Sequence, residues 1–316
     1  MDYAWAAALV LIPAIFLLLR VSSAVGVEDA RRFLRELSLD IDSPVIRTLA
    51  ENIELKLESE RALILQRVSQ RLRTLRVAYI VVDFQNDFVS GSLAIGNGDA
   101  GEDPHEAIDP TNNIIALDGF QLLVFTRDWH PADHISFLEN ARLPDRTLAA
   151  EYVTKDLKLF EPVEFEQPKR KQVLYPSHCV RDTEGAEIID EGTETLMDSY
   201  SAFMDNEKKT KTGLEPLLRS HNIDAVIVSG LAYDICVMHT SADASTLGFY
   251  TAVVRDASAA LSMAGIAETK VLFKNKNVSV LQSSQIEKIL TDHRFPPEWI
   301  AKAVEDVLRE MDGGKL

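Results

Sequence analysis

The sequence predicts an α/β protein: a three-layer α/β/α sandwich with a mainly parallel central sheet, preceded by a helical N-terminal arm. Residues 77–82 form an unbroken apolar run of mostly β-branched residues, which is typical of a strand covered on both faces. Helix-like segments separate such runs, and this alternation favours parallel strands with helices on both faces. The apolar runs 122–125 and 225–230 read as two further buried strands, and residues 249–254 and 278–281 as the remaining strands.

The overall charge restricts the partners of the chain. The 316 residues carry a formal net charge of −16, and such a surface repels the phosphates of nucleic acid. The two cysteines, Cys179 and Cys236, cannot build a disulfide framework. We therefore expect no nucleic-acid partner, but the charge does not identify a substrate.

Residues 1–24 read as a hydrophobic signal anchor or signal peptide. Residues 3–19 are almost wholly apolar, short for a membrane span and slightly long for a signal-peptide core. Small residues at 22–24 suit cleavage, whereas the arginines follow the apolar stretch and would leave an anchored domain in the cytosol. We therefore expect a secretory or membrane-anchored protein, and both a cytosol-facing and a secreted form stay open.

The rest of the chain divides into three units. Residues 25–75 carry apolar positions at helical spacing, which indicates a helical extension. We expect this extension to pack on the domain or on a second copy of the chain. In the second case the protein would be a homo-oligomer. Residues 76–292 form the main domain, and 293–316 a C-terminal helical tail.

Metal-ligating side chains gather after the apolar run 122–125. Asp128, His130 and His134 follow it within a few residues, and Pro131 stiffens the loop. His178 offers a further imidazole. Carboxylate and imidazole together suit a divalent metal ion, with zinc preferred over iron or manganese. The alternative is a polar surface loop in an acidic protein.

Two other side chains follow strands in a way that indicates chemistry. Asp83 comes directly after residues 77–82, at the strand end where ligands bind in open α/β sheets. Its alternative role is a helix or turn cap. Cys236 comes at the start of a helix after another strand, where the helix dipole lowers a thiol pKa. Its alternative role is that of a small buried hydrophobe.

Five ordered motifs carry a family resemblance. The motifs read VDFQNDF at residues 82–88, DWHPADH at 128–134, PSHCV at 176–180, DSYSAF at 198–203 and GLAYDICV at 230–237. With these motifs the chain resembles the nicotinamidase branch of the isochorismatase-like hydrolases, and its first 75 or so residues lie outside the match. The resemblance implies hydrolysis of nicotinamide to nicotinate and ammonia, with a metal ion gripping the pyridine nitrogen.

The resemblance also implies a role for each matching residue. Cys236 would be the nucleophile, and Asp83 would take its proton and pass it to the leaving ammonia. The backbone N–H groups of Ala232 and Cys236 would form the oxyanion hole, and relatives have a cis peptide just before that alanine. The metal ligands would be Asp128, His130 and His178, with His134 nearby or a further ligand in some relatives. The nicotinamide ring would lie among Phe88, Tyr175 and Tyr200.

The chain departs from the family pattern at one catalytic position. Relatives carry a lysine that completes the triad, and here Glu191 stands in its place within a shortened segment. A carboxylate there should raise the pKa values of Asp83 and Cys236, because like charges disfavour both ionised forms. Each unit of pKa is worth about 1.4 kcal/mol, so the effect on rate can be large. Nothing in the sequence brings the nearby Lys208, Lys209 or Lys211 to this position.

Two functions are consistent with these observations. The first is metal-assisted, cysteine-dependent hydrolysis of nicotinamide despite the altered triad. The second is an impaired or inactive form that acts as a metal- or nicotinamide-binding or regulatory protein. Isochorismate-type vinyl ether hydrolysis is disfavoured, since that branch does not need the metal ligands that this chain retains.

Overall fold

The structure is a computed structural model. Two residues of the predicted site, Glu191 and Tyr200, lie outside the residues it describes, as do the apolar segment 1–24 and most of the 25–75 extension. The described residues are 58–187, 201–204 and 211–311.

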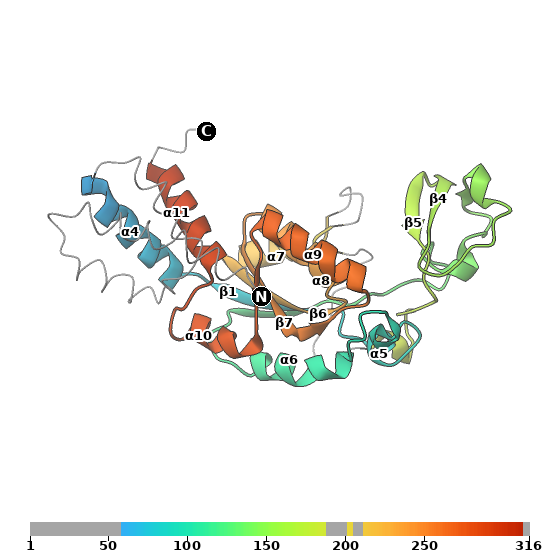
Figure 1. The fold of residues 1–316 in the computed structure, drawn as a ribbon, viewed down its shortest axis with the longest axis horizontal. Helices are drawn as coiled ribbons and strands as arrows, with labels where there is room; N and C mark the ends of the chain where they lie inside the picture. The colour runs from blue at the N-terminus through green and yellow to red at the C-terminus, as the bar shows by residue number, and fades with distance from the viewer. Residues whose placement is uncertain (1–57, 188–200, 205–210, 312–316) are drawn as a thin grey trace.

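Strands and helices alternate along the described chain (Figure 1). The strands are β1 Val77–Val82, β2 Leu122–Phe125, β3 Thr147–Leu148, β4 Pro162–Gln167, β5 Arg170–Val173, β6 Ala225–Leu231, β7 Tyr250–Ala259 and β8 Ser279–Leu281. The α-helices are α4 Glu58–Arg73, α5 Asn86–Val89, α6 Ile108–Ile115, α7 Leu214–Ser220, α8 Cys236–Thr246, α9 Met263–Lys276, α10 Ile286–Leu290 and α11 Pro297–Met311.

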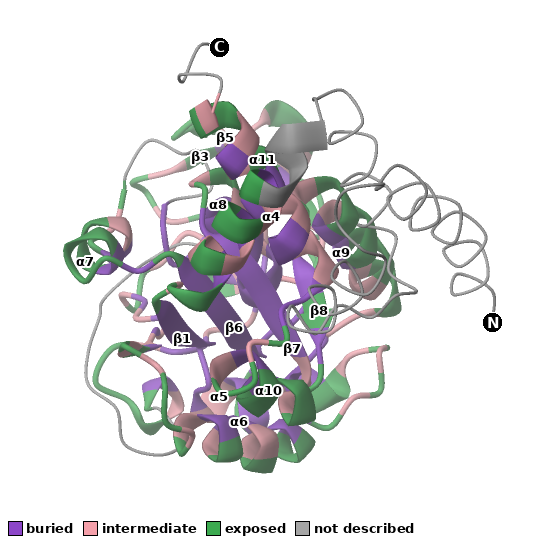
Figure 2. Ribbon diagram, turned by 90° about the vertical axis from the view of Figure 1, so that its left-hand side faces the viewer, coloured by how far each residue is buried: buried purple, intermediate pink, exposed green. Residues whose placement is uncertain are grey.

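The central sheet is parallel throughout. Its order is β2-β1-β6-β7-β8, and every neighbouring pair runs in the same direction. Strands β1 and β6 are buried along their whole length, whereas the surrounding helices expose an outer side (Figure 2). The predicted mainly parallel α/β sandwich is therefore confirmed.

Two hydrophobic clusters cover the two faces of this sheet. Side chains of β1 alternate between them: Tyr79 lies in the first cluster and Ile80 in the second. Helices α4, α6, α10 and α11 contribute to the first cluster, and α7, α8 and α9 to the second. The alternation follows from the two-residue repeat of a strand, which sends successive side chains to opposite layers.

Strand β2 differs from its sequence-based interpretation as a buried strand. It lies at the edge of the sheet, paired only with β1, and of its four residues only Val124 is buried. Leu123 is 40% exposed. An apolar run shows that a segment can be buried, but its place in the strand order decides whether a neighbour covers it.

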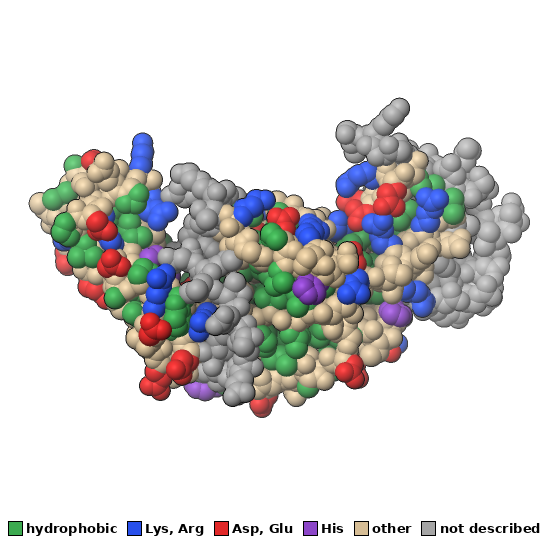
Figure 3. All heavy atoms as spheres, turned by 180° about the vertical axis from the view of Figure 1, so that it is seen from behind, with side chains coloured by type: hydrophobic (Ala, Val, Ile, Leu, Met, Phe, Trp, Pro, Cys, Tyr) green, Lys and Arg blue, Asp and Glu red, His purple; other side chains and the backbone are tan. Residues whose placement is uncertain are grey.

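A small antiparallel sheet stands apart from the central one. Strands β3, β4 and β5 form it between residues 147 and 173, where we expected no strand from the sequence. Buried Val163 and Phe165 alternate with exposed residues in β4 and pack in a separate cluster with Leu148. The lobe projects from the body and carries exposed apolar side chains (Figures 1 and 3).

The described part of the N-terminal extension packs on this chain's own domain. Val68 and Leu72 of α4 are buried in the first cluster beside α11, which contributes the fully buried Trp299. Arg71 forms ion pairs with Asp306, at 3.4 Å, and with Glu310.

The expected membrane-anchored or secretory location needs correction. Among the helices of the described residues, none has the length and apolar character needed to cross a bilayer. The apolar segment 1–24 on which the expectation rested lies outside those residues.

Candidate active site

Three parallel strands deliver the reactive side chains to one end of the sheet. Asp83 follows β1, Asp128 follows β2, and Cys236 begins α8 after β6. Because β1 is the central partner of both other strands, their carboxyl ends lie side by side. The fold thus brings together residues that are far apart in the sequence.

Asp83 is fixed at the point where β1 ends. Its backbone N–H donates to the carbonyl of Thr126 at 3.2 Å, and its carboxylate accepts the Thr126 hydroxyl at 2.7 Å. Its φ of 48° is left-handed, a conformation that aspartate tolerates better than most residues. A hydrogen bond also joins its carboxylate to the thiol of Cys236. Thr126, which stands between strand and metal loop, therefore orients the predicted base.

Cys236 is the first residue of the 11-residue helix α8 and is buried. Burial, followed by the negative charges of Asp83 and Asp128, raises the pKa of its thiol well above the usual value. A hydrogen bond from the Ala232 backbone opposes this shift. The thiol is therefore protonated at neutral pH unless positive charge enters the site.

The same excess of negative charge affects Asp83. Burial and then the charge of Asp128 raise the pKa of Asp83 to about 8, although the hydroxyl of Thr126 and the thiol of Cys236 stabilise its ionised form. An acid with such a pKa can accept and return a proton near neutral pH. The hydrogen-bonded pair Asp83–Cys236 is thus arranged for proton transfer, and its ionisation requires a nearby cation.

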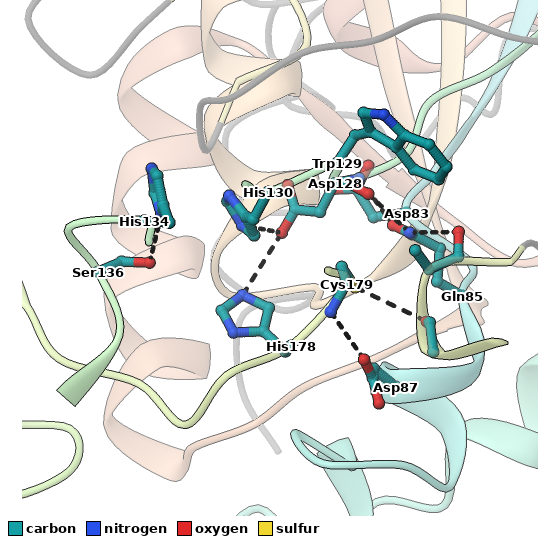
Figure 4. A network of polar contacts seen from close by, with 12 residues as sticks. Asp83, Gln85, Asp87, Asp128, Trp129, His130, His134, Ser136, His178 and Cys179 are labelled. Carbon is teal, nitrogen blue, oxygen red and sulfur yellow. Dashed lines mark hydrogen bonds and ion pairs between the residues drawn. The ribbon is translucent and has the colours of Figure 1, made fainter. Parts of the chain in front are cut away.

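A candidate metal centre lies beside this pair. Asp128, His130 and His178 are all buried, and one ligand atom from each lies within 4.8 Å of the other two. The distances from the Asp128 Oδ2 atom are 3.3 Å to His130 Nε2 and 3.7 Å to His178 Nε2 (Figure 4). These donors suit a divalent metal ion, which would bring the three atoms together around itself.

Neighbouring groups prepare these ligands. The Nδ1 atom of His178 lies 2.8 Å from the carbonyl oxygen of Pro176, so Nε2 is the nitrogen directed at Asp128. Burial acts to raise the pKa of Asp128, but His130 and His178 outweigh it through charge and hydrogen bonds and hold the pKa below the usual value. The Asp128 carboxylate is therefore ionised, as a metal ligand must be.

His134 occupies a different position from the other histidines. Its ring stacks on that of His130 at 4.2 Å, and its Nδ1 atom lies 2.7 Å from the hydroxyl of Ser136. It does not belong to the described cluster of three ligands. The geometry is that of a side chain supporting His130 from the outer side.

Aromatic rings surround His178. Phe88 lies 5.7 Å from it and Tyr175 5.8 Å, measured between ring centroids. Phe137, which the sequence did not single out, makes edge contacts with the rings of His130, His134 and His178. The walls beside the candidate metal centre are therefore aromatic on several sides.

The turn between β6 and α8 contains the two predicted oxyanion donors. The Leu231–Ala232 peptide bond is cis, as the resemblance implies. The carbonyl oxygen of Ala232 accepts the N–H groups of Ile235 and Val237 at 3.1 Å each. Ala232 and Cys236 are thereby held in one tight turn.

The predicted lysine position stays outside this description. Glu191 is not among the described residues, and neither are Lys208 and Lys209. Lys211 is exposed, and its Nζ atom lies 3.4 Å from Glu215 in a surface ion pair. Lys211 therefore has a partner elsewhere.

Gln85, just before α5, and Asp87, in the first turn of α5, hold the candidate site together and were not predicted to do so. Gln85 and Asp87 belong to the motif at residues 82–88, but their spacing gave no indication of their partners. Both form hydrogen bonds to the backbone of loops that carry metal ligands. Only the folded chain reveals this, because the loops are 43 and 92 residues away.

Comparison with known proteins identifies the family of the chain. The isochorismatase domain matches residues 77–285. The chain belongs to the isochorismatase domain family. Its curated relatives include the nicotinamidases of Acinetobacter baylyi, at 37% identity over 60% of this chain and 83% of the relative, and of Escherichia coli, at 34% identity over 57% and 81%.

Solved structures of the family have the same fold. A nicotinamidase/pyrazinamidase from Acinetobacter baumanii has a TM-score of 0.56 and 32% identity, covering 67% of this chain and 98% of its own. The yeast nicotinamidase bound to the inhibitor nicotinaldehyde has a TM-score of 0.52 and 28% identity, covering 65% and 99%.

Proposed function

We propose that this isochorismatase-family protein hydrolyses nicotinamide to nicotinate and ammonia. The observation that carries the proposal is the hydrogen-bonded pair Asp83–Cys236 beside a buried cluster of three metal-ligating side chains. Nicotinamidases among the relatives, and a nicotinamidase that binds nicotinaldehyde among the solved structures, support the choice of substrate.

The residues account for each step of an amide hydrolysis. Asp83 takes the thiol proton of Cys236, whose sulfur attacks the carboxamide carbon. Asp83 returns that proton to the nitrogen as the C–N bond breaks, so ammonia leaves and a thioester remains. Water then adds to the thioester carbon and gives up a proton to Asp83, and the Cys236 sulfur leaves and is protonated as nicotinate is released. The N–H groups of Ala232 and Cys236 hold the carbonyl oxygen in both additions.

We propose that Asp128, His130 and His178 hold one divalent metal ion, with zinc preferred over iron or manganese on the chemistry of these donors. Their shared burial and the ionised state of Asp128 fit such an ion. When bound, the ion supplies positive charge and a ligand position for the pyridine nitrogen. Phe88, Tyr175 and Tyr200 would then hold the ring.

Glu191 favours a second candidate function. It replaces the lysine of relatives, and the raised pKa values of Asp83 and Cys236 indicate a site that needs more positive charge. An impaired form would keep the metal centre and the aromatic walls, and it would act as a metal- or nicotinamide-binding or regulatory protein.

The experiment is an ammonia-release assay with nicotinamide on the purified, metal-loaded protein. We expect activity that increases in Glu191→Lys, because an ammonium at this position would stabilise the ionised forms of Asp83 and Cys236. Cys236→Ala is the negative control. Metal content is measured on the same samples.

The outcomes separate the two functions. Ammonia release that depends on Cys236 supports the hydrolase. A protein that binds metal and nicotinamide but releases no ammonia, in either the original or the Glu191→Lys form, supports the binding function. A protein that binds neither contradicts both.

A further inference from the structure

The geometry points to Gln85 and Asp87 as positioning residues of the metal centre: each fixes the backbone of a loop that carries a metal ligand. This inference rests on the metal site proposed above. It assigns a role to two side chains that touch neither the metal ligands' donor atoms nor the reacting atoms.

Gln85 holds the metal ligand Asp128 from behind. The side chain is fully buried, and its Oε1 atom accepts the backbone N–H of Asp128 at 2.7 Å. Its Nε2 group donates to the carbonyl oxygen of Asp128 at 2.8 Å and to that of Ala186 at 2.9 Å (Figure 4). One amide group therefore fixes both polar backbone groups of the ligand residue, as a neighbouring strand would do.

This link continues the sheet beyond its last regular pair. The ladder between β1 and β2 ends with Val81 opposite Phe125. Asp128 comes three residues later, beyond the end of β2 and outside that ladder. The Gln85 side chain supplies the missing donor and acceptor, so the direction of the Asp128 side chain depends on it.

Asp87 does the same for the loop of His178. Its Oδ2 atom accepts the backbone N–H of Cys179 at 2.7 Å, and Oδ1 accepts that of Ser92 at 2.9 Å. Cys179 follows the ligand directly and has a left-handed φ of 47°. The carboxylate thus stabilises an unfavourable backbone conformation next to His178.

The surroundings of Asp87 are shaped for its carboxylate. A Cβ atom added to Gly185 or to Gly91 would collide with the Asp87 side chain. The turn at 184–187 is also fixed by Asn86, whose side-chain amide donates to Glu184 at 2.8 Å. Three consecutive side chains, Gln85, Asn86 and Asp87, therefore gather the loops around the site.

Removing either link should loosen the ligands without removing a ligand. Hydrogen bonds behind the ligands of metal sites typically change metal affinity by about 10- to 100-fold when lost. Gln85→Met keeps the side-chain length and leaves three buried backbone groups without their partner. Asp87→Asn keeps the shape and loses one acceptor.

The test measures zinc affinity by chelator competition and the visible absorption of the cobalt-substituted protein. We expect Gln85→Met to weaken zinc binding by about 10- to 100-fold and to change the cobalt spectrum, with a smaller change of the same kind in Asp87→Asn. The matched control is Tyr79→Phe. It removes a buried hydrogen bond, 2.6 Å long, between Tyr79 of β1 and Ser229 of β6, and this bond involves no loop that carries a proposed metal ligand.

The midpoint of thermal unfolding of each metal-free variant separates an effect on the position of the metal ligands from a general loss of stability. The inference is supported if Tyr79→Phe loses thermal stability but binds zinc as the original protein does, while Gln85→Met and Asp87→Asn bind it more weakly. It is overturned if zinc affinity and cobalt spectrum are unchanged in both positioning variants, or if the control weakens binding equally. If Gln85→Met does not fold, the zinc affinity and cobalt spectrum of Asp87→Asn decide the test. An original protein that binds no metal overturns the proposed metal site and this inference together.

Discussion

The two cysteines occupy neighbouring parts of the same site, but their surroundings use them differently. Cys179 and Cys236 are both free and buried, and burial followed by nearby aspartates raises the pKa of both thiols. Cys236 begins a helix, and its sulfur is hydrogen-bonded to Asp83 and to the Ala232 backbone. Cys179 lies in a loop, where its sulfur is 3.9 Å from the carbonyl oxygen of Gly185.

Cys179 acts through its backbone instead. Its N–H donates to Asp87, and its carbonyl oxygen accepts the N–H of His130 at 3.0 Å. The residue therefore connects the two histidine loops, and its sulfur fills space. Although Cys179 is next to a candidate metal ligand, the carboxylate that could act as a base, Asp83, is hydrogen-bonded to the sulfur of Cys236.

The comparison is tested most strongly by Cys236→Ala. We expect nicotinamide hydrolysis to fall by on the order of 10⁴-fold or more, because the attacking atom is gone. The variant should still fold and bind metal. Initial rates of ammonia release and metal content provide the measurement, and a variant with more than about a tenth of the original rate would contradict the assignment of the nucleophile.

Asp83→Asn tests the base that distinguishes the two cysteines. We expect the rate to fall by about 10³-fold, within the range of general acid–base catalysis, because the amide cannot accept the thiol proton. The Thr126 hydroxyl can still donate to the amide oxygen. A rate close to the original would exclude Asp83 as the base.

The same variant should be more stable than the original protein at neutral pH. The pKa of Asp83 is about 8 in the folded chain, so folding takes up a proton between about pH 4 and pH 8, and stability falls as the pH rises through this window. Asparagine carries no such penalty. Chemical denaturation of chelator-treated protein should show a gain of more than about 1 kcal/mol at pH 7 that shrinks toward pH 4. A gain that does not depend on pH would contradict the raised pKa.

His178→Ala tests the metal side of the comparison. Removing one of three ligands should weaken zinc binding by at least about 100-fold and reduce the rate accordingly. The thiol of Cys236 should also become slower to alkylate at pH 7, since the bound cation favours its ionised form. Zinc titration and iodoacetamide labelling measure the two effects. Unchanged zinc affinity would remove His178 from the ligand set.

Cys179→Ala should have the smallest effect. The backbone links of residue 179 stay, so we expect the rate to remain within about threefold of the original and the free energy of unfolding to fall by about 1 kcal/mol for the lost packing. The assay and a urea titration run in parallel with those of Cys236→Ala. A loss of rate comparable to that of Cys236→Ala would show that the two sulfurs share the chemistry.

The sequence was sufficient for the parts of the fold that depend on short-range pattern. The runs that became β1 and β6 predicted strands buried on both faces, and both are buried throughout. Strand β2 has an equally apolar run but lies at the sheet edge. A residue pattern shows whether a strand can be buried, whereas the position of the strand in the sheet depends on the whole chain.

The site was predictable only where a side chain sits at a strand end or in a motif. Asp83 and Asp128 could be selected because their spacing from apolar runs fixes which end of the sheet they reach, and His178 because it belongs to the motif PSHCV. Gln85 and Asp87 could not be assigned roles, since their partners lie 43 and 92 residues along the chain. The antiparallel lobe was missed because β3, with 2 residues, and β5, with 4, are too short for an alternating pattern.

Helices α4 and α11 have a practical consequence for any shortened version of this protein. Both lie outside the isochorismatase match at 77–285, yet Trp299 of α11 stacks against Phe295 and makes an edge contact with Tyr250 of the central sheet. A fragment trimmed to the matched residues would lack Trp299 and Phe295, and it would uncover Tyr250 along with the face of the sheet that α4 and α11 cover. The part of the chain that can be recognised by resemblance is therefore smaller than the part that must be produced together to obtain a folded protein.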